Sequence, residues 1–309
     1  MEKTFFCVAG APRCGTTALY TYLSEHPNIF MSVVKELHYF ADDFKNMQKI
    51  DFKSDSEYLK TYAKAGGDHL AIGEASPFYL FSKVAFQKIH AFDSDTRIII
   101  SLRNPVDFIH SYHQLNLSLL REDEEDLEKA WELQEARSKG ENLPKNLREV
   151  ELLMYGEIGL FGKKLEKLFS IFPREQVKIV LLDDFVADAK TVYEDILAFL
   201  NLPFDNRTVF PKVNANFTNR SQFLAKFFHP SPAVYKLFMK TISLFGANFM
   251  KWVSMIYNRI ERLNTTKKPR TEMDPKLRAR LTAYFSSDIE KLSKLIDRDL
   301  SAWTHIPKA

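Results

Sequence analysis

Residues 10–17, Gly-Ala-Pro-Arg-Cys-Gly-Thr-Thr (GAPRCGTT), lie between an apolar run and a helical pattern near the start of the chain. The run at residues 4–9, TFFCVA, is rich in aromatic and β-branched side chains, which predicts a buried strand. Apolar residues then recur at helical spacing from Thr16 until Pro27 ends the pattern. A strand, a glycine-containing loop and a helix form the first half of a βαβ unit. We therefore expect the N–H groups of the loop and of the helix N-terminus to converge on an anion.

Three further apolar runs predict buried strands, and each is followed by a helical pattern. The strands are expected at residues 70–72 with the following Gly73 and Glu74, at 97–102 and at 177–182, and the helices at 84–91, 105–120 and 188–200. Continuous apolar strands that alternate with helices indicate a mostly parallel sheet covered on both faces. Amphipathic helices are also predicted at 155–172 and, with one apolar face, at 274–299. The fold class is therefore α/β, with three layers and a helical C-terminal part.

The chain, residues 1–309, is interpreted as one domain with a helical insertion or lid at approximately residues 206–266. Its composition, 45% hydrophobic and 27% charged, is ordinary for a globular protein. The acidic stretch at 121–129, REDEEDLEK, is interpreted as a solvated helix end or a mobile connection. The Phe- and Met-rich segment 223–260 is interpreted as core, while an apolar acceptor site and a peripheral membrane contact stay open as alternatives.

Charge and cysteine content limit the partners and the compartment. The net charge of +3 gives no basicity that calls for nucleic acid, so no nucleic-acid partner is expected. Cys7 and Cys14 are too few for a disulfide framework, and two reduced thiols fit a cytoplasmic location. No apolar run reaches the roughly 18 residues of a membrane span. The first strand also starts too early to leave room for a signal peptide. The oligomeric state is left open.

The residues of the GAPRCGTT loop suit a bound phosphate. Gly15 lets the backbone approach an oxygen closely, Thr16 and Thr17 offer hydroxyl donors, and Arg13 carries a permanent positive charge. The loop lacks the GK[ST] ending of a Walker A motif, and no second acidic motif for magnesium is evident. A P-loop kinase or NTPase is therefore a less favoured alternative, and a non-catalytic nucleotide-binding module is another. Because cations and N–H groups would bind the anion, we expect no metal requirement.

The loop resembles the 5′-phosphosulfate-binding loop of sulfotransferases that use PAPS (3′-phosphoadenosine 5′-phosphosulfate). A second stretch, RIIISLRNPVDFIHSY at 97–112, resembles the 3′-phosphate motif of the same family. It implies that Arg103 and Ser111 hold the 3′-phosphate, since arginine is a bidentate phosphate ligand. The resemblance covers nearly the whole chain and implies a P-loop-type fold. It also implies that the 5′-phosphosulfate contacts Pro12, Arg13, Cys14, Gly15, Thr16 and Thr17.

A third stretch, KELHYF at residues 35–40, resembles the Glu-x-His-aromatic-Phe segment of carbohydrate and bacterial sulfotransferases. The resemblance implies that Glu36 is the base that takes the acceptor's proton, while Arg13 balances charge on the leaving oxygen. His38 is the rival base, because a neutral imidazole suits pH 7 better than an unshifted carboxylate.

GEASPFY at residues 73–79 resembles a segment that lines the same cleft in the family. It implies that Glu74 and Ser76 contact the acceptor, although Glu74 could orient its neighbours instead and Ser76 could merely shape the turn. Some relatives that sulfate heparan have a lysine where this chain has Ala75, so Lys35, itself expected near the acceptor, or Lys268 would have to supply that charge. A basic stretch before the last helix resembles the loop that closes over the nucleotide phosphates: Lys267, Lys268 and Arg270.

The resemblance implies in-line transfer of the sulfuryl group from PAPS to a hydroxyl or amine, with release of adenosine 3′,5′-bisphosphate. Positioning and electrostatics would supply most of the catalysis, as in phosphoryl transfer. The carbohydrate-type motifs favour a carbohydrate or glycoconjugate acceptor, and a lipid or small-molecule alcohol is the alternative.

Overall fold

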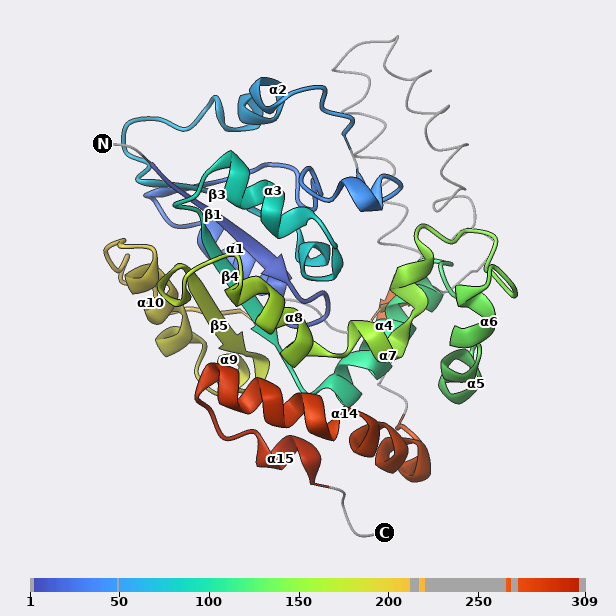
Figure 1. The fold of residues 1–309 in the computed structure, drawn as a ribbon. Helices are drawn as coiled ribbons and strands as arrows, with labels where there is room; N and C mark the ends of the chain where they lie inside the picture. Colours follow the sequence, from blue (N-terminus) through green and yellow to red (C-terminus); the bar gives the residue numbers. More distant parts are fainter. Residues whose placement is uncertain (1–2, 49, 212–216, 220–264, 268–271, 306–309) are drawn as a thin grey trace. The chain divides into compact units, whose positions relative to one another are not determined.

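The computed structural model describes residues 3–48, 50–211, 217–219, 265–267 and 272–305 (Figure 1). The chain divides into two compact units. The first takes its residues from 1–108, 159–214 and 278–309, and the second from 109–158 and 215–277. The GAPRCGTT loop and all the predicted strands belong to the first unit, which therefore positions most of the candidate site.

A five-stranded parallel sheet forms the centre of the first unit (Figure 1). The strand order is β2-β3-β1-β4-β5, so the strand that precedes the GAPRCGTT loop lies in the middle. The strands are β1 Thr4–Gly10, β2 Ile29–Met31, β3 Ala71–Ala75, β4 Arg97–Leu102 and β5 Val177–Leu181. The parallel sheet is thereby confirmed, and β2 is the strand of this sheet that was not predicted.

Helices surround the sheet. In the first unit these are α1 Thr16–Ser24, α2 Asp55–Leu59, α3 Ala85–Phe92, α8 Phe161–Phe169, α9 Leu182–Ala187, α10 Ala189–Phe199 and α15 Ser301–Thr304. Two helices, α4 Pro105–Ser118 and α14 Pro275–Ile296, run across the division between the units. The second unit holds α5 Leu127–Glu132, α6 Gln134–Ser138, α7 Tyr155–Ile158 and the antiparallel strands β6 Phe217–Asn219 and β7 Thr265–Lys267. Short 3₁₀ turns are η1 Asp42–Phe44, η2 Lys60–Tyr62, η3 Pro77–Phe81, η4 Val150–Leu153 and η5 Arg174–Gln176.

Successive side chains of β1 point to opposite faces of the sheet. Phe6 and Val8 join a core cluster that includes residues of α1 and α10. The ring of Phe5 instead contacts Tyr58 of α2 and Phe92 of α3. Both faces are covered by helices, which confirms the three-layer α/β prediction.

The strand register brings the site-forming segments to one edge of the sheet. Val8 pairs with Ala75 of β3, and Met31 of β2 pairs with Gly73. Since parallel strands all end at the same edge, the loops that follow β1, β2, β3 and β4 begin side by side there.

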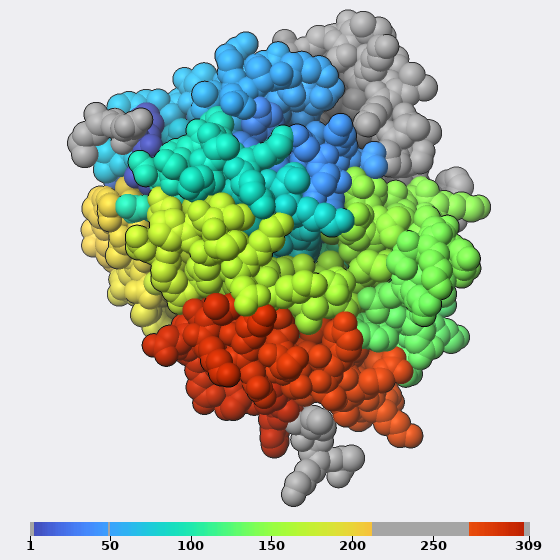
Figure 2. Space-filling view, viewed as in Figure 1, coloured from blue at the N-terminus to red at the C-terminus, as the bar shows by residue number. Residues whose placement is uncertain are grey.

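The long helix α14 packs along α8. The carboxylate of Asp288 accepts hydrogen bonds from the N–H groups of Gly162 at 2.7 Å and Lys163 at 2.8 Å. Figure 2 shows the two segments side by side on the surface of the first unit, α8 in yellow-green and α14 in red. The single helix predicted at 155–172 is wrong: two helices, α7 and α8, replace it, because Asp288 satisfies a second helix start from far along the chain.

In the second unit, the acidic stretch at 121–129 contains a buried carboxylate. The side chain of Glu122 is 0% exposed, and Arg137 donates to its two oxygens at 2.7 and 2.6 Å. The Tyr155 hydroxyl adds a third bond at 2.8 Å. Burial alone would raise the pKa of Glu122, but the hydrogen bonds from Arg137 and its neighbours outweigh burial and lower it. The interpretation of this stretch as solvated or mobile is therefore wrong at Glu122, because a buried arginine neutralises it.

Candidate active site

The loop after β1 is held against the end of β4 and turns directly into α1. The Ala11 N–H donates to the Ser101 carbonyl at 2.7 Å, and the Ser101 hydroxyl donates to the Cys14 carbonyl. Gly15 precedes α1 with φ 85°, and a side chain there would meet Leu182 at 3.0 Å, so this position requires glycine. The first N–H groups of a helix have no acceptor within it, which suits this end of α1 to an anion.

Two arginines follow neighbouring strands of the sheet. Arg13 belongs to the loop after β1, and Arg103 follows β4. Burial, and after it the positive charge of Arg103, lowers the pKa of the Arg13 guanidinium. Within the described residues, the buried Nε of Arg103 has no hydrogen-bond partner. Two guanidinium groups beside a helix N-terminus fit a ligand with more than one negative charge, as the 3′- and 5′-phosphates of PAPS would provide.

Cys14 lies within the same loop as a neutral thiol. Burial raises its pKa to about 12, although the charges of Arg103 and Arg13 act in the opposite direction. A thiol with this pKa is not a nucleophile near pH 7, so Cys14 is suited to packing and backbone contacts. The neighbouring Pro12 and Thr16 are buried, and Thr17 is half-buried.

The segment after β2 reaches the start of α1 through a lysine. The Lys35 ammonium donates to the Thr17 hydroxyl at 2.8 Å and lies 3.5 Å from Oε1 of Glu36. The Glu36 side chain is 33% exposed, whereas the His38 residue is 1% exposed. These contacts bring together residues of two predicted motifs, Lys35 and Glu36 of KELHYF and Thr17 of GAPRCGTT.

Three alternate N–H groups of the KELHYF segment donate to residues 75–79. The pairs are Glu36 N–H to the Ala75 carbonyl at 2.9 Å, His38 N–H to the Ser76 hydroxyl at 3.1 Å and Phe40 N–H to the Tyr79 hydroxyl at 3.3 Å. These contacts fix the backbone that carries the candidate bases.

Glu74 belongs to β3, directly before these contacts in the chain, and is 0% exposed. Its carboxylate accepts hydrogen bonds from the hydroxyls of Tyr58 at 2.6 Å, Ser76 at 2.7 Å and Tyr79 at 2.9 Å. Burial raises the pKa of Glu74, and the three hydrogen bonds act against that rise. Ser76 and Tyr79 thus donate to Glu74 and accept from the KELHYF backbone. This geometry favours the alternative in which Glu74 orients its neighbours.

Tyr58 is a member of this cluster that sequence reasoning missed. It belongs to the short helix α2, 16 positions before Glu74, and no local motif marks it. Tyr79, by contrast, is the last residue of the GEASPFY stretch, so its place near Glu74 had a signal in the sequence.

The backbone of the site is strained at three of the predicted residues. Arg13, Glu36 and His38 have left-handed conformations with φ of 65°, 62° and 53°. That conformation costs a residue with a side chain roughly 1–2 kcal/mol, so the surrounding contacts must enforce it. Strained backbone of this kind is found at functional sites, but it also occurs at five other non-glycine residues of the described chain, so it does not by itself mark a site.

The remaining predicted residues lie elsewhere or outside the described ranges. Ser111 is buried on α4, in the part of that helix that belongs to the second unit. Lys267 is the last residue of β7, while Lys268 and Arg270 lie outside the described residues. Most of the predicted lid at 206–266 and the whole Phe- and Met-rich segment at 223–260 also lie outside them. Their predicted roles stay predictions.

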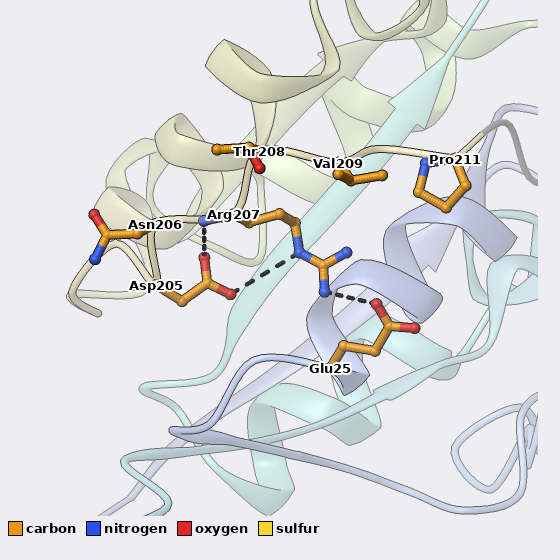
Figure 3. A pocket seen from close by; sticks show the side chains of 7 residues that line it. All are labelled: Glu25, Asp205, Asn206, Arg207, Thr208, Val209 and Pro211. Carbon is orange, nitrogen blue, oxygen red and sulfur yellow. Dashed lines mark hydrogen bonds and ion pairs between the residues drawn. The ribbon is translucent and has the colours of Figure 1, made fainter.

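A pocket of about 460 Å³ lies where residues 205–211 return to the C-terminal end of α1 (Figure 3). Arg207 donates to the Glu25 carboxylate at 2.6 Å and lies 3.9 Å from that of Asp205. Two carboxylates already neutralise this arginine. The Arg207 contacts therefore anchor the chain that follows α10, and we assign no ligand to the pocket.

Among the described residues, no group of three or more His, Cys, Asp or Glu side chains could hold a metal ion. In the same part of the chain, no helix has the length and apolar character needed to cross a membrane. The expected independence from metal and the expected compartment stay predictions.

A parallel sheet flanked by helices, with a glycine-containing loop that runs from its central strand into a helix, defines the class of P-loop-type α/β proteins. The sequence also matches a family model described as a sulfotransferase domain, over residues 3–294. The chain therefore belongs to the sulfotransferase family, as its motifs indicated.

The chain is similar to several members of this family. A crystal structure of a sulfotransferase from Alicyclobacillus acidocaldarius superimposes with a TM-score of 0.70 and 26% identity, covering 99% of this chain and 100% of that one. Carbohydrate sulfotransferase 15 from Homo sapiens is 24% identical over 247 residues, which are 64% of this chain and 43% of the relative. The membrane-associated sulfotransferase kil1 of Dictyostelium discoideum is 28% identical over 116 residues, 38% of this chain and 24% of the relative. The chain thus spans less than half the length of these curated relatives.

Proposed function

We propose that the protein transfers the sulfuryl group of PAPS to a hydroxyl group, or alternatively an amine, of a carbohydrate or glycoconjugate. The observation that carries the proposal is the placement of Arg13 and Arg103 after the adjacent strands β1 and β4, together with the contact of Lys35 with the start of α1 and with Glu36. Membership of the family supports sulfuryl transfer, and the carbohydrate sulfotransferase among its relatives supports the acceptor class.

The donor would bind through backbone and cations. Residues 12–17 would hold the 5′-phosphosulfate, with N–H groups after Pro12 and the hydroxyls of Thr16 and Thr17 as donors, because they lie at a helix start that favours anions. Arg13 would balance charge on the oxygen that leaves with the nucleotide. Arg103 would hold the 3′-phosphate, with Ser111 as its predicted partner. Lys267, Lys268 and Arg270 stay proposed as nucleotide contacts.

Glu36 would act as the base. It accepts the acceptor's proton while the acceptor oxygen forms a bond to sulfur and the bond from sulfur to the bridging oxygen breaks, releasing adenosine 3′,5′-bisphosphate. Its side chain is 33% exposed and paired with a cation, whereas His38 is 1% exposed and packs edge-on against Phe78 at 5.6 Å. These observations support Glu36 over His38.

A lipid or small-molecule alcohol is a second candidate acceptor. Val33 and Val34, 79% and 37% exposed, directly precede Lys35 and place apolar surface beside the proposed base. An acceptor with an apolar portion would cover these side chains, and a glycolipid would combine both classes.

The test is PAPS-dependent release of adenosine 3′,5′-bisphosphate by the purified chain, measured across oligosaccharide, glycolipid and simple alcohol acceptors. We expect release that requires an acceptor and that persists in EDTA. Turnover of ATP with Mg²⁺ in place of PAPS would support a kinase or NTPase, and nucleotide binding without turnover on any acceptor would support a non-catalytic module. Cell fractionation would test the cytoplasmic location, which we also keep as a proposal.

A further inference from the structure

The contact between Lys35 and Thr17 fixes the direction of a proton. An ammonium group carries only donors, so the Thr17 oxygen, 2.8 Å away, must be the acceptor. A hydroxyl that accepts from a cation turns its own proton away from that cation. Thr17 is the second residue of α1, so its hydroxyl belongs to the helix start that favours an anion.

The same ammonium also lies 3.5 Å from the Glu36 carboxylate. Lys35 is half-buried, with 21% of its side chain exposed, so water competes less for these contacts than at an open surface. The neighbouring backbone is fixed as well, because the Glu36 N–H donates to the Ala75 carbonyl at 2.9 Å. One cation thus connects the start of α1 with the carboxylate proposed as the base.

We infer that Lys35 is a positioning residue that turns the Thr17 hydroxyl into a donor toward the bound nucleotide and holds Glu36 beside it. This inference rests on the proposed function and deepens it. A hydroxyl polarised by a neighbouring cation is a stronger donor, so part of the nucleotide affinity attributed to Thr17 depends on Lys35. Lys35 itself need not touch the nucleotide.

The first test is a double-variant cycle that measures binding of adenosine 3′,5′-bisphosphate by calorimetry. Lys35→Met keeps the length of the side chain without its charge, and Thr17→Val keeps the shape without the hydroxyl. We expect each single variant to weaken binding about tenfold, as for a lost hydrogen bond to a charged group. Both variants remove one shared contact. The affinity of the double variant should therefore be at most about threefold lower than that of the single variant that binds more weakly.

Two results of this cycle would overturn the inference. Losses that multiply to about 100-fold would mean that Lys35 binds the nucleotide independently of Thr17. Wild-type affinity in Lys35→Met would mean that the ammonium has no role in binding. Lys178→Met is the matched control, since Lys178 is 30% exposed and pairs with Asp195 at 3.4 Å on another part of the sheet. Its affinity should equal that of the wild type.

The second test measures turnover with saturating PAPS. Lys35→Met should lower kcat about tenfold or more, Lys35→Arg should retain most of it, and added ethylamine should partly restore it in Lys35→Ala. Equal thermal unfolding of these variants shows that folding is intact. An unchanged kcat in Lys35→Met would contradict a role of the contact between Lys35 and Glu36 in turnover. A wild type that neither binds the bisphosphate nor releases it from PAPS contradicts the proposed function, whereas a normal wild type with an unaffected Lys35→Met contradicts only the role of Lys35.

Discussion

Glu36 and Glu74 lie on two segments that hydrogen-bond to each other, but the surroundings of their carboxylates differ. Glu36 is 33% exposed and lies beside an ammonium group. Glu74 is 0% exposed and accepts from three hydroxyls, with no cation among those partners. The first can meet a substrate, and the second can only act on its neighbours. The two glutamates are therefore suited to different tasks, Glu36 to the proposed proton transfer and Glu74 to holding the backbone.

The largest expected effect is on the exposed carboxylate. Glu36→Gln should lower kcat by about 10²–10⁴-fold, because the acceptor loses its base, while unfolding stays close to wild type. His38→Ala is the comparison variant. If Glu36→Gln keeps near wild-type turnover and His38→Ala loses it, the base is His38. The exposure of Glu36 would then not reflect a catalytic role.

Removing the buried carboxylate should act on stability first. Glu74→Ala leaves the hydroxyls of Tyr58, Ser76 and Tyr79 without their acceptor, so the free energy of unfolding should fall by about 2–4 kcal/mol. Glu36→Ala should cost less than about 1 kcal/mol, as expected for a partly exposed ion pair. Chemical denaturation of both variants makes the measurement. Equal losses would show that the two carboxylates do not differ as described.

The proposed phosphate-binding arginines should control nucleotide affinity. Arg103→Ala should weaken binding of adenosine 3′,5′-bisphosphate by about 10- to 100-fold through lost charge-assisted hydrogen bonds. Arg298→Ala, which removes an exposed arginine paired with Asp184 at 2.8 Å, serves as the control in calorimetry. Comparable losses in both variants would mean that only general positive charge matters.

The smallest expected effect is a dependence of stability on pH. Burial raises the pKa of Glu74 above the ordinary glutamate value of 4.5. At pH values between 4.5 and the raised pKa of folded Glu74, the folded protein binds more protons than the unfolded chain. In this window Glu74 therefore makes stability fall as pH rises. Glu74→Gln removes that contribution. Its stability relative to the wild type should therefore increase with pH across the window and stay constant above it, and a flat or falling difference in denaturation experiments would contradict a raised pKa.

The sequence predicted most of the sheet because its central strands are unbroken apolar runs. The bounds of β4 were predicted without error, since charged or polar residues flank RIIISL on both sides. The strand β2 was missed because three residues, Ile29–Met31, are too few to show a period. The break between α7 and α8 depends on Asp288, more than a hundred positions later, which no local pattern could reveal.

The sequence marks the candidate site where its residues lie in short motifs. Arg13 and Arg103 were both expected at a phosphate, and the parallel topology places them after adjacent strands, while their phosphate contacts stay predictions. The surroundings of Glu74 were not predictable, because Tyr58 comes from α2 and the degree of burial depends on packing from distant segments. Likewise, Lys35 was expected near the acceptor, and only the structure shows its contact with Thr17.

The KELHYF segment is a loop, but hydrogen bonds protect its backbone N–H groups from exchange as they would in a strand. The amide hydrogens of Glu36, His38 and Phe40 donate to residues 75–79, so they would exchange with deuterated solvent only when that edge of the core opens. The fraction of molecules in which Glu36, the proposed base, is displaced is then set by the stability of the sheet and not by independent loop motion. A variant with a loosened core would lose turnover at temperatures well below its melting temperature.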